Sequence, residues 1–414
     1  MLDTAIYRLA LGAYALAIRL AARFKPKARL FVDGRKDVLP RMQAALAQEG
    51  RPRIWMHCAS LGEFEQGRPV LEALRQQYPG HAIVLTFFSP SGYEVRKHYD
   101  GADYICYLPL DSEANASAFL DTVKPALCIF VKYEFWYYYL SAMQARHIPC
   151  LLISAIFRKE QGFFRWYGTL QRRMLRSFSH IFVQNGESLQ LLAGIGITNA
   201  SICGDTRFDR VVAAAASASA TLPLADEFCN RHKILIAGST WADDESLLQK
   251  ALPLLPADWK LILVPHEVHD SHIHAIMQQF GAGISRWSGG TIQPGSRVLL
   301  VDKVGLLLQL YRYGTAAWIG GGFGRAGVHN VLEAAVYGLP CYHGPIYHQF
   351  IEARELISQG GASAIARPGE LAAAIASLSS PDEYATRSAI ARNYVLAHCG
   401  ATRIILGYVA AMQW

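Results

Sequence analysis

The sequence predicts an α/β protein with two doubly wound domains, each built on a parallel sheet with helices on both faces. The first observation is that short β-rich runs alternate with helical patterns from about residue 50, as they do in consecutive βα units. The second is that the low-complexity stretch 213–220 interrupts this alternation, which restarts at residue 233. With 414 residues, 52% of them apolar, the chain is long enough to give each domain a core.

Short apolar runs mark the expected strands. Continuous apolar residues without alternation are typical of strands that are buried on both faces. The expected strands are 53–57, 82–87, 126–131, 150–154 and 180–184 in the first domain, and 233–238, 260–265, 296–301 and 316–320 in the second. We predict a membrane-anchor helix at 1–24, a Rossmann-like domain at 25–212, a linker at 213–230, a second Rossmann-like domain at 231–390 and a C-terminal helix at 391–414. Ligands of such sheets bind beyond the carboxyl ends of the strands, so the expected site is the cleft between the domains.

The N-terminal segment has the composition of a membrane-contacting helix. Residues 4–22 are apolar except for Arg8 and Arg19, and their length is close to the thickness of a bilayer core. The two arginines lie eleven residues apart and so share one helix face. This pattern suits a helix in the membrane interface, or a short span with snorkelling arginines. The alternative is a first helix that packs on the domain; a cleaved signal peptide is disfavoured because no small-residue cleavage site precedes the basic run.

The charge distribution points to an anionic surface as partner. Eight Lys and Arg and two Asp fall within residues 1–36, which places +6 of the formal net charge of +7 there. Nucleic-acid binding would need a basic stripe on a folded domain, so this asymmetry points instead to an N-terminal contact with an anionic surface. The eight cysteines show no CxxC pairing and lie mostly in apolar runs, which indicates reduced core residues and no metal site.

A glycine-rich loop in the second domain predicts anion binding. Residues 320–327, GGGFGRAG, follow an expected strand and precede an expected helix at 328–336. The loop matches a dinucleotide fingerprint, but no acidic residue stands at a strand end about 20 residues later, which disfavours a nicotinamide cofactor. His329, Asn330 and Glu333 would lie where the phosphate and ribose of a nucleotide bind. The alternatives are a tight turn and a glutamate that only stabilises its own helix.

The first domain carries acidic residues beyond two expected strands. Glu63 follows a small-residue loop at a helix start, where a carboxylate can act as a general base. Glu65 competes for this role, and such a carboxylate is often only a helix-stabilising group. Glu134 follows another strand end, and residues 204–210 bring charges to the end of the domain; either could be a solvated turn.

Residues 157–180 interleave aromatic and basic side chains, among them Arg158 and Arg165. Rings that meet acyl chains and arginines that meet phosphates suit a phosphorylated amphiphile. RNA would fit the composition, but the N-terminal segment favours lipid.

Five motifs in order carry a family resemblance. They are HCASLGE at 57–63, YEFW at 133–136, GDTRFD at 204–209, GST at 238–240 and GVHNVLE at 327–333. Together they resemble the 3-deoxy-D-manno-octulosonic acid (Kdo) transferase family of lipopolysaccharide biosynthesis. The resemblance implies a GT-B architecture, with two Rossmann-like domains facing a cleft and an N-terminal membrane-associated helix. It also implies transfer of Kdo from CMP-Kdo to a lipid A precursor with inversion, without a metal or other cofactor, at the cytoplasmic face of the inner membrane of a Gram-negative bacterium.

The resemblance also assigns site residues. Glu63 matches the general base, and Glu134 and Arg207 match positions that stabilise the transition state. Acceptor contacts are expected from Ser60, Gly62, Arg158 and Arg165. CMP contacts are expected from Pro265, His266, Val304, Gly305, Gly327, His329, Asn330 and Glu333.

The sequence departs from the family pattern in three segments. The frequent Pro-Arg-His reads Pro265-His266-Glu267, so either His266 or Arg325 would replace the cation at the CMP phosphate. The frequent Glu-Thr-Glu-Leu-Trp-Pro-Asn reads KYEFWYY at 132–138, which keeps Glu134, and the Met-Gly-Glu segment reads Val304-Gly305-Leu306.

Three other functions compete with this hypothesis. A transferase that uses a UDP-sugar would be stabilised by UDP instead of CMP. An NAD-dependent oxidoreductase would use the glycine fingerprint, and a non-enzymatic membrane scaffold would need no shared site.

Overall fold

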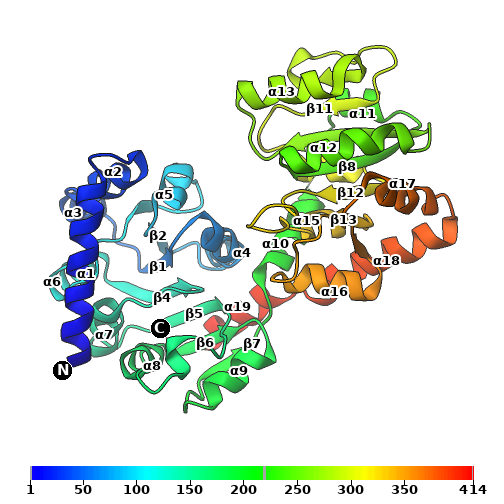
Figure 1. The fold of residues 1–414 in the computed structure, drawn as a ribbon. Coiled ribbons are helices and arrows are strands. Elements are labelled where there is room, and N and C mark those ends of the chain that lie inside the picture. Colours follow the sequence, from blue (N-terminus) through cyan, green and yellow to red (C-terminus); the bar gives the residue numbers. More distant parts are fainter. Residues whose placement is uncertain (1, 218–220, 413) are drawn as a thin grey trace. The chain divides into compact units, whose positions relative to one another are not determined.

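The computed structural model describes residues 2–217, 221–412 and 414, which fold as two compact α/β units (Figure 1). Unit 1 comprises Met1–Arg210 and Gly400–Trp414, and unit 2 comprises Val211–Cys399. The linker predicted at 213–230 includes residues 218–220, which lie outside the described residues; α10 (Thr206–Ser217) and α11 (Pro223–Cys229) flank them. The domain boundaries drawn from the sequence stay predictions.

Unit 1 is built on a parallel sheet of seven strands in the order β3-β2-β1-β4-β5-β6-β7. All five strands expected from the sequence are present, and the short strands β3 and β7 were not foreseen. The strands are β1 (Arg53–Cys58), β2 (Ala82–Phe87), β3 (Tyr104–Tyr107), β4 (Pro125–Val131), β5 (Cys150–Ala155), β6 (His180–Val183) and β7 (Ala200–Ile202).

Side chains alternate along each strand between two cores, one on each face of this sheet. In β1, Trp55 packs in one core, whereas Ile54 and Met56 pack in the other. The Trp55 side is covered by α3 (Val38–Leu46), α6 (Glu113–Val123), α7 (Tyr137–Ala145), α8 (Thr169–Arg176) and α9 (Gly186–Ala193), and the Met56 side by α4 (Leu61–Gln77) and α19 (Ala401–Ala411). The remaining helices of this unit are α1 (Leu2–Ala21), α2 (Pro26–Asp33) and α5 (Pro90–Arg96).

Unit 2 has a second parallel sheet of seven strands, in the order β10-β11-β9-β8-β12-β13-β14. Its four predicted strands are confirmed, and three three-residue strands are additional. The strands are β8 (Lys233–Thr240), β9 (Trp259–Pro265), β10 (Ile284–Arg286), β11 (Val298–Leu300), β12 (Ala316–Ile319), β13 (Cys341–His343) and β14 (Ala362–Ala364). The helices are α12 (Ala242–Ala251), α13 (Asp270–Phe280), α14 (Leu307–Leu310), α15 (Leu332–Ala335), α16 (Ile351–Gln359), α17 (Pro368–Ser377) and α18 (Pro381–Ala397). The predicted α/β fold with two doubly wound sheets is therefore confirmed.

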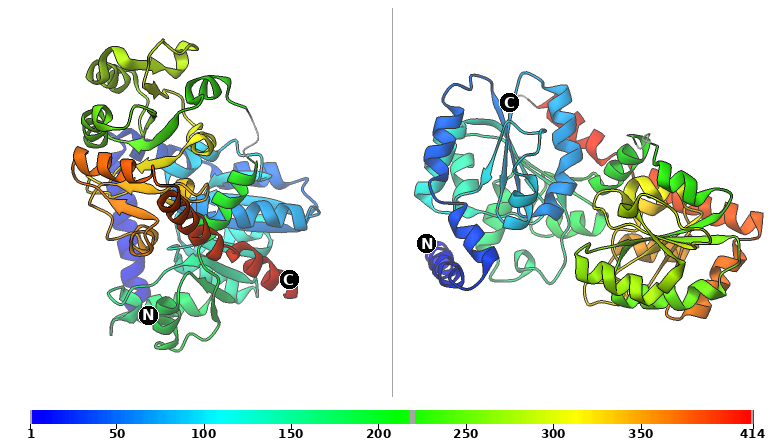
Figure 2. Two further views of the ribbon diagram at one scale, coloured as in Figure 1. Left: turned by 90° about the vertical axis from the view of Figure 1, so that its right-hand side faces the viewer. Right: turned by 90° about the horizontal axis from the view of Figure 1, so that it is seen from above.

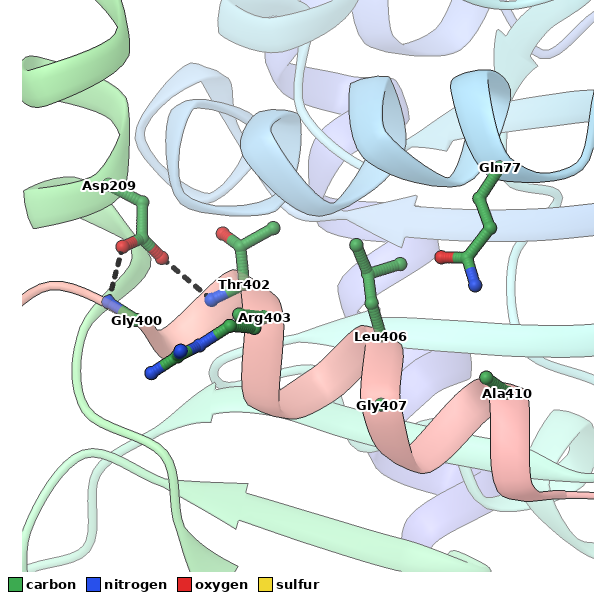
Figure 3. Close-up of a pocket in the computed structure, with 8 residues that line it drawn as sticks. All are labelled: Gln77, Asp209, Gly400, Thr402, Arg403, Leu406, Gly407 and Ala410. Carbon is green, nitrogen blue, oxygen red and sulfur yellow. Dashed lines mark hydrogen bonds between the residues drawn. The ribbon is translucent and has the colours of Figure 1, made fainter.

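The last helix of the chain belongs to unit 1. The Asp209 carboxylate accepts hydrogen bonds from the backbone N–H groups of Gly400 and Thr402, both at 2.6 Å (Figure 3). These N–H groups at the start of α19 have no partner within the helix, so the carboxylate caps it. Ile405 and Val409 then pack in the core on the Met56 side of the sheet. A shallow pocket lined by Gln77, Leu406 and Gly407 lies between α4 and α19.

The N-terminal helix α1 lies along the outside of unit 1, against α2 and α8 (Figures 1 and 2). The span Asp3–Ala21 is long and apolar enough to cross a membrane, and none of its residues is fully buried. The stretch Pro381–Ala411 passes the same test but is partly buried and includes the core helix α19. Leu9, Leu16 and Leu20 of α1 are 72%, 60% and 50% exposed. Unit 1 thus leaves one apolar face of this helix uncovered.

Candidate active site

In each sheet several candidate residues follow the two central strands, where the order of strands reverses. Ligands bind at such points in doubly wound sheets because adjacent loops diverge there. In unit 1 these strands are β1, which Glu63 follows, and β4, which Glu134 follows. In unit 2 they are β8, which ends with the Gly238–Thr240 motif, and β12, which the glycine-rich loop follows.

A buried hydrogen-bond network holds Glu134. His57 Nε2 lies 2.8 Å from Glu134 Oε2, and Trp136 Nε1 donates to the same oxygen at 2.6 Å. Trp136 Nε1 also lies 3.2 Å from His57 Nε2. This contact is longer than the one to Glu134, so the indole proton goes to the carboxylate. His57 is fully buried and Glu134 is 6% exposed. The network therefore fixes the Glu134 carboxylate with two ring N–H groups.

The other side of the imidazole determines which nitrogen carries the proton. Thr86 Oγ1 accepts a hydrogen bond from Trp55 Nε1 at 2.8 Å and lies 2.8 Å from His57 Nδ1. Because an indole N–H only donates, the Thr86 hydroxyl proton is left for His57 Nδ1. His57 Nε2 is then protonated and donates to Glu134. The sequence did not reveal this network, since its members come from β1, β2 and the loop after β4.

Glu63 and Glu65 have different surroundings. Glu65 forms ion pairs with Arg96 at 2.6 Å and Arg210 at 2.9 Å. Glu63, in the first turn of α4, accepts a hydrogen bond from the Ser60 hydroxyl and pairs with no Lys or Arg among the described residues. Ser60 and the exposed Gly62 flank the start of α4. Glu63 is thus the carboxylate that is available for chemistry.

The charges of several candidate residues act on two neighbouring groups. Burial, followed by the carboxylates of Glu63, Glu134 and Glu65, raises the pKa of the Cys58 thiol at the end of β1. Burial also raises the pKa of Tyr133, which the Glu63 carboxylate raises further and the Arg158 guanidinium lowers. The structure therefore brings Glu63, Glu134 and Arg158 to the same end of the unit 1 sheet.

Two further predicted arginines lie in the loops and helices beyond β5 and β7. Arg207, in the first turn of α10, pairs with Asp205 through its Nε at 2.8 Å and its Nη2 at 2.7 Å. Arg165 is exposed in the segment between β5 and α8, where its Nε approaches the Glu160 carbonyl at 3.4 Å. Trp166, next to it, is 89% exposed. This segment presents rings and cations to solvent.

In unit 2, the helix predicted at 328–336 is wrong. The helix α15 has only four residues and begins at Leu332. The N–H groups of Val328 and His329 donate at 3.0 Å to the carbonyls of Ile346 and Gly320, and Gly327 N–H donates to Gly324. A positive φ of 79° at Gly327 turns the chain toward residues 346–350, a turn that favours glycine. These N–H groups are consumed within the loop, so they do not form the expected anion-binding helix start.

A stack of aromatic rings stands beside this loop. His266 lies between Trp241 and His329, with ring centroids 4.7 and 4.6 Å apart and interplanar angles of 28° and 19°. Trp241 Nε1 donates to His329 Nε2 at 2.9 Å. Burial, and then the neighbouring His266, lower the pKa of His329, which keeps this imidazole neutral as an acceptor. Trp241 was not among the predicted site residues.

Asp244 is a second residue that the sequence prediction missed. Its buried carboxylate accepts hydrogen bonds from the N–H groups of Gly321 and Trp241, at 2.9 and 3.0 Å, and from the Trp318 indole at 3.1 Å. It therefore fixes both the glycine-rich loop and the start of α12. An acidic residue in the first turn after a strand end, in the sequence GSTWADDE, is the signal that could have revealed it.

The remaining predicted nucleotide contacts lie at the same end of the unit 2 sheet. Pro265 ends β9, and Val304 and Gly305 lie in the exposed loop after β11. Asn330 donates from its side-chain amide to Glu333 Oε1 at 3.2 Å and accepts from the Leu332 N–H. Within the described ranges, no three His, Cys, Asp or Glu side chains are grouped as a metal site.

The family model for "3-Deoxy-D-manno-octulosonic-acid transferase (kdotransferase)" matches residues 33–210. The chain is 29% identical over 315 residues to the 3-deoxy-D-manno-octulosonic acid transferase of Aquifex aeolicus, covering 75% of this chain and 80% of that protein. It is 27% identical over 373 residues to the enzyme of the same name from Bordetella pertussis, covering 84% and 85%.

Two solved structures have the same fold. The UDP-GlcNAc 2-epimerase of Neisseria meningitidis bound to UDP-GlcNAc matches with a TM-score of 0.62 at 15% identity, covering 87% of this chain and all of that one. Acinetobacter baumannii MurG matches with a TM-score of 0.56 at 14% identity and the same coverage. Both share the GT-B-like pair of Rossmann-like sheets. The sequence matches make this chain similar to 3-deoxy-D-manno-octulosonic acid transferases over most of its length.

Proposed function

We propose that this protein is an inverting glycosyltransferase that moves Kdo from CMP-Kdo to a lipid A precursor. The observation that carries the proposal is the pair of carboxylates at the switch point of unit 1, in a chain similar to this family. Glu63 forms no ion pair with any residue that the structure describes, and Glu134 is fixed by two N–H donors.

On the acceptor side, Glu63 acts as the general base. The acceptor hydroxyl oxygen attacks the anomeric carbon of Kdo as the bond from that carbon to the CMP phosphate oxygen breaks, and the hydroxyl proton passes to the Glu63 carboxylate. The Ser60 hydroxyl holds this carboxylate in place. Glu134 and Arg207 stabilise the charge that develops in the transition state, since each is fixed by hydrogen bonds before the reaction.

On the donor side, side chains rather than backbone N–H groups hold CMP. The N–H groups of Val328 and His329 are already used, whereas the His266 side chain is exposed and its ring forms no hydrogen bond in the part of the chain that the structure describes. We assign the phosphate contact to His266 in the Trp241–His266–His329 stack. Glu333, one turn into the segment after the loop, takes the ribose hydroxyls.

The helix α1 and the segment 158–167 serve the membrane and the acceptor. The apolar face of α1 with Leu9, Leu16 and Leu20 faces away from unit 1, with Arg8 and Arg19 at its edge. Such a helix inserts its apolar face among acyl chains while its arginines reach lipid phosphates. Arg158 and Arg165, beside the exposed Trp166, suit the phosphates of a lipid A precursor. We therefore place the enzyme at the cytoplasmic face of the inner membrane.

The test is transfer from CMP-Kdo to a tetraacyl lipid A precursor, with the product measured by mass spectrometry. Glu63→Gln should lower turnover by about 10²- to 10⁴-fold, as expected for loss of a general base. Glu65→Gln is the matched control two residues away and should keep transfer activity. Wild-type turnover by Glu63→Gln would refute the assignment of the base.

The rival nucleotide is tested separately. CMP should raise the melting temperature of the wild-type protein and of Glu63→Gln alike, because Glu63 lies in unit 1 and is not assigned to CMP. Stabilisation by UDP and not by CMP would refute the donor.

A further inference from the structure

One face of α1 is connected to the surroundings of Glu134 by two separate routes. Both routes begin at tyrosines of α1 and end at residues 136–139, which start two residues after Glu134. Tyr7 and Tyr14 are seven residues apart, which is close to two helical turns, so they lie on one face of the helix.

The first route passes through Asp111. The Tyr7 hydroxyl donates to Asp111 Oδ2 at 2.7 Å, and Asp111 accepts from the N–H groups of Tyr138 and Tyr139 at 3.0 and 3.1 Å. Asp111 is 5% exposed. Its carboxylate caps α7, which begins three residues after Glu134, and Tyr7 therefore completes the cap from outside. The Tyr7 ring also packs edge-on against Tyr137, at 6.0 Å between centroids.

The second route is a series of rings. Tyr14 stacks on Phe88 with centroids 6.3 Å apart, and Phe88 packs on Trp136 at 4.6 Å. Trp136 is the residue whose indole N–H donates to Glu134 at 2.6 Å. Arg35 holds Phe88 in place, because its Nη2 donates to the Phe88 carbonyl at 2.6 Å and its guanidinium lies over the same ring.

Among the described residues, none of these contacts involves the opposite face of α1. Leu9 and Leu16 point away from unit 1 and are 72% and 60% exposed. The helix therefore carries two different sets of side chains. One set can meet a membrane, and the other is connected to the Glu134 network. Substitutions can change one face and leave the other intact.

We propose that α1 is a positioning element for Glu134, in addition to any role in binding the membrane. Tyr14 positions Trp136 through Phe88, and Tyr7 positions the start of α7 through Asp111. The proposal rests on the proposed function, in which Glu134 stabilises the transition state. Its consequence is that a docked α1 is needed for turnover even where no membrane has to be bound.

The experiment uses the full-length protein in detergent micelles that also contain the acceptor. Tyr14→Ala should lower kcat by about tenfold, because the ring that orients Trp136 loses its support, while KM for CMP-Kdo stays unchanged. Tyr14→Phe keeps the stacked ring and should restore kcat. Tyr7→Phe keeps the ring but removes the hydrogen bond to Asp111, so its loss of kcat should be smaller than that of Tyr14→Ala.

The control variant is Leu9→Ser on the uncovered face. It should weaken binding to vesicles of phosphatidylethanolamine and phosphatidylglycerol, while its kcat in micelles stays well above that of Tyr14→Ala. Melting temperatures within a few degrees of wild type show that each variant is folded. Wild-type kcat in micelles for both Tyr14→Ala and Tyr7→Phe would overturn the inference, as would a failure of Tyr14→Phe to restore kcat. A wild-type protein that makes no Kdo product would instead refute the proposed function.

Discussion

The two units share one topology but differ in what they place at the point where the order of strands reverses. In unit 1 that point is a buried polar network around two carboxylates, with Trp55, Thr86 and His57 behind Glu134. In unit 2 it is a glycine-rich loop, braced by Asp244 and bordered by stacked rings. The first arrangement holds groups that accept protons or stabilise positive charge, and the second offers space and ring faces to a ligand. A shared fold therefore fixes where the site lies, and the loops decide its chemistry.

The largest effect should come from filling the loop of unit 2. A Cβ at Gly322 would lie 2.5 Å from the backbone N of Gly344, and neither backbone can move away without breaking the loop. Gly322→Ala should cost about 3–4 kcal/mol of unfolding free energy. Gly324→Ala is the control, because its Cβ would meet nothing closer than 3.7 Å. Calorimetry measures both, and equal melting temperatures would contradict the tight packing of this loop.

In unit 1, a substitution that keeps the side-chain volume at Thr86 should break the polar network. Thr86→Val leaves Trp55 Nε1 and His57 Nδ1 buried without their partner. The expected loss of stability is about 2–4 kcal/mol, with a fall in kcat because His57 no longer has a fixed tautomer. Thr86→Ser keeps the hydroxyl and should retain most of both quantities. Full stability of Thr86→Val in urea unfolding would show that the network contributes nothing.

The cap that joins the C-terminal helix to unit 1 should have a smaller effect. Asp209→Ala removes the acceptor of two N–H groups at the start of α19. It should cost about 1–2 kcal/mol, as for other helix caps. Asp209→Asn keeps one acceptor oxygen and should lose less. Hydrogen exchange of residues 400–409 is the measurement, and unchanged protection in Asp209→Ala would rule out the cap.

The smallest expected effect is a pH dependence of stability that comes from the ring stack of unit 2. The pKa of His329 is lowered in the folded protein, so the unfolded chain binds a proton more readily. Stability should therefore fall as pH decreases below the ordinary histidine pKa of about 6.5. His329→Gln should remove this part of the pH dependence. Identical pH profiles of unfolding for the two proteins would contradict a neutral His329 in the stack.

Strands were predicted more reliably from the sequence than loops. Long apolar runs such as 126–131 gave all the central strands, because burial on both faces leaves a continuous apolar signal. The strands β7 and β13 were missed because each has only three residues and no apolar pattern around it. The helix expected at 328–336 failed because the N–H groups of Val328 and His329 donate to Ile346 and Gly320. Contacts of this kind are absent from local propensity.

The candidate site shows the same division. The motifs identified Glu63 and Glu134, since strand ends and helix starts are local features. Glu63 could not be separated from Glu65 by sequence, because the arginines that pair with Glu65 come from α5 and α10. Trp241 and Asp244 were missed for a related reason: their partners lie in the glycine-rich loop, about 80 residues further along the chain.

The place of α19 in unit 1 has a consequence for synthesis of the protein. Ile405 and Val409 complete the core on one face of the unit 1 sheet, but they are made after all of unit 2. On the ribosome, unit 2 is therefore the first unit whose sequence is complete, although unit 1 begins to emerge first. Until α19 arrives, Ile54 and Met56 lie on a sheet face that lacks one of its covering helices. A nascent chain that stalls before residue 400 exposes this apolar surface, which makes it a target for chaperones.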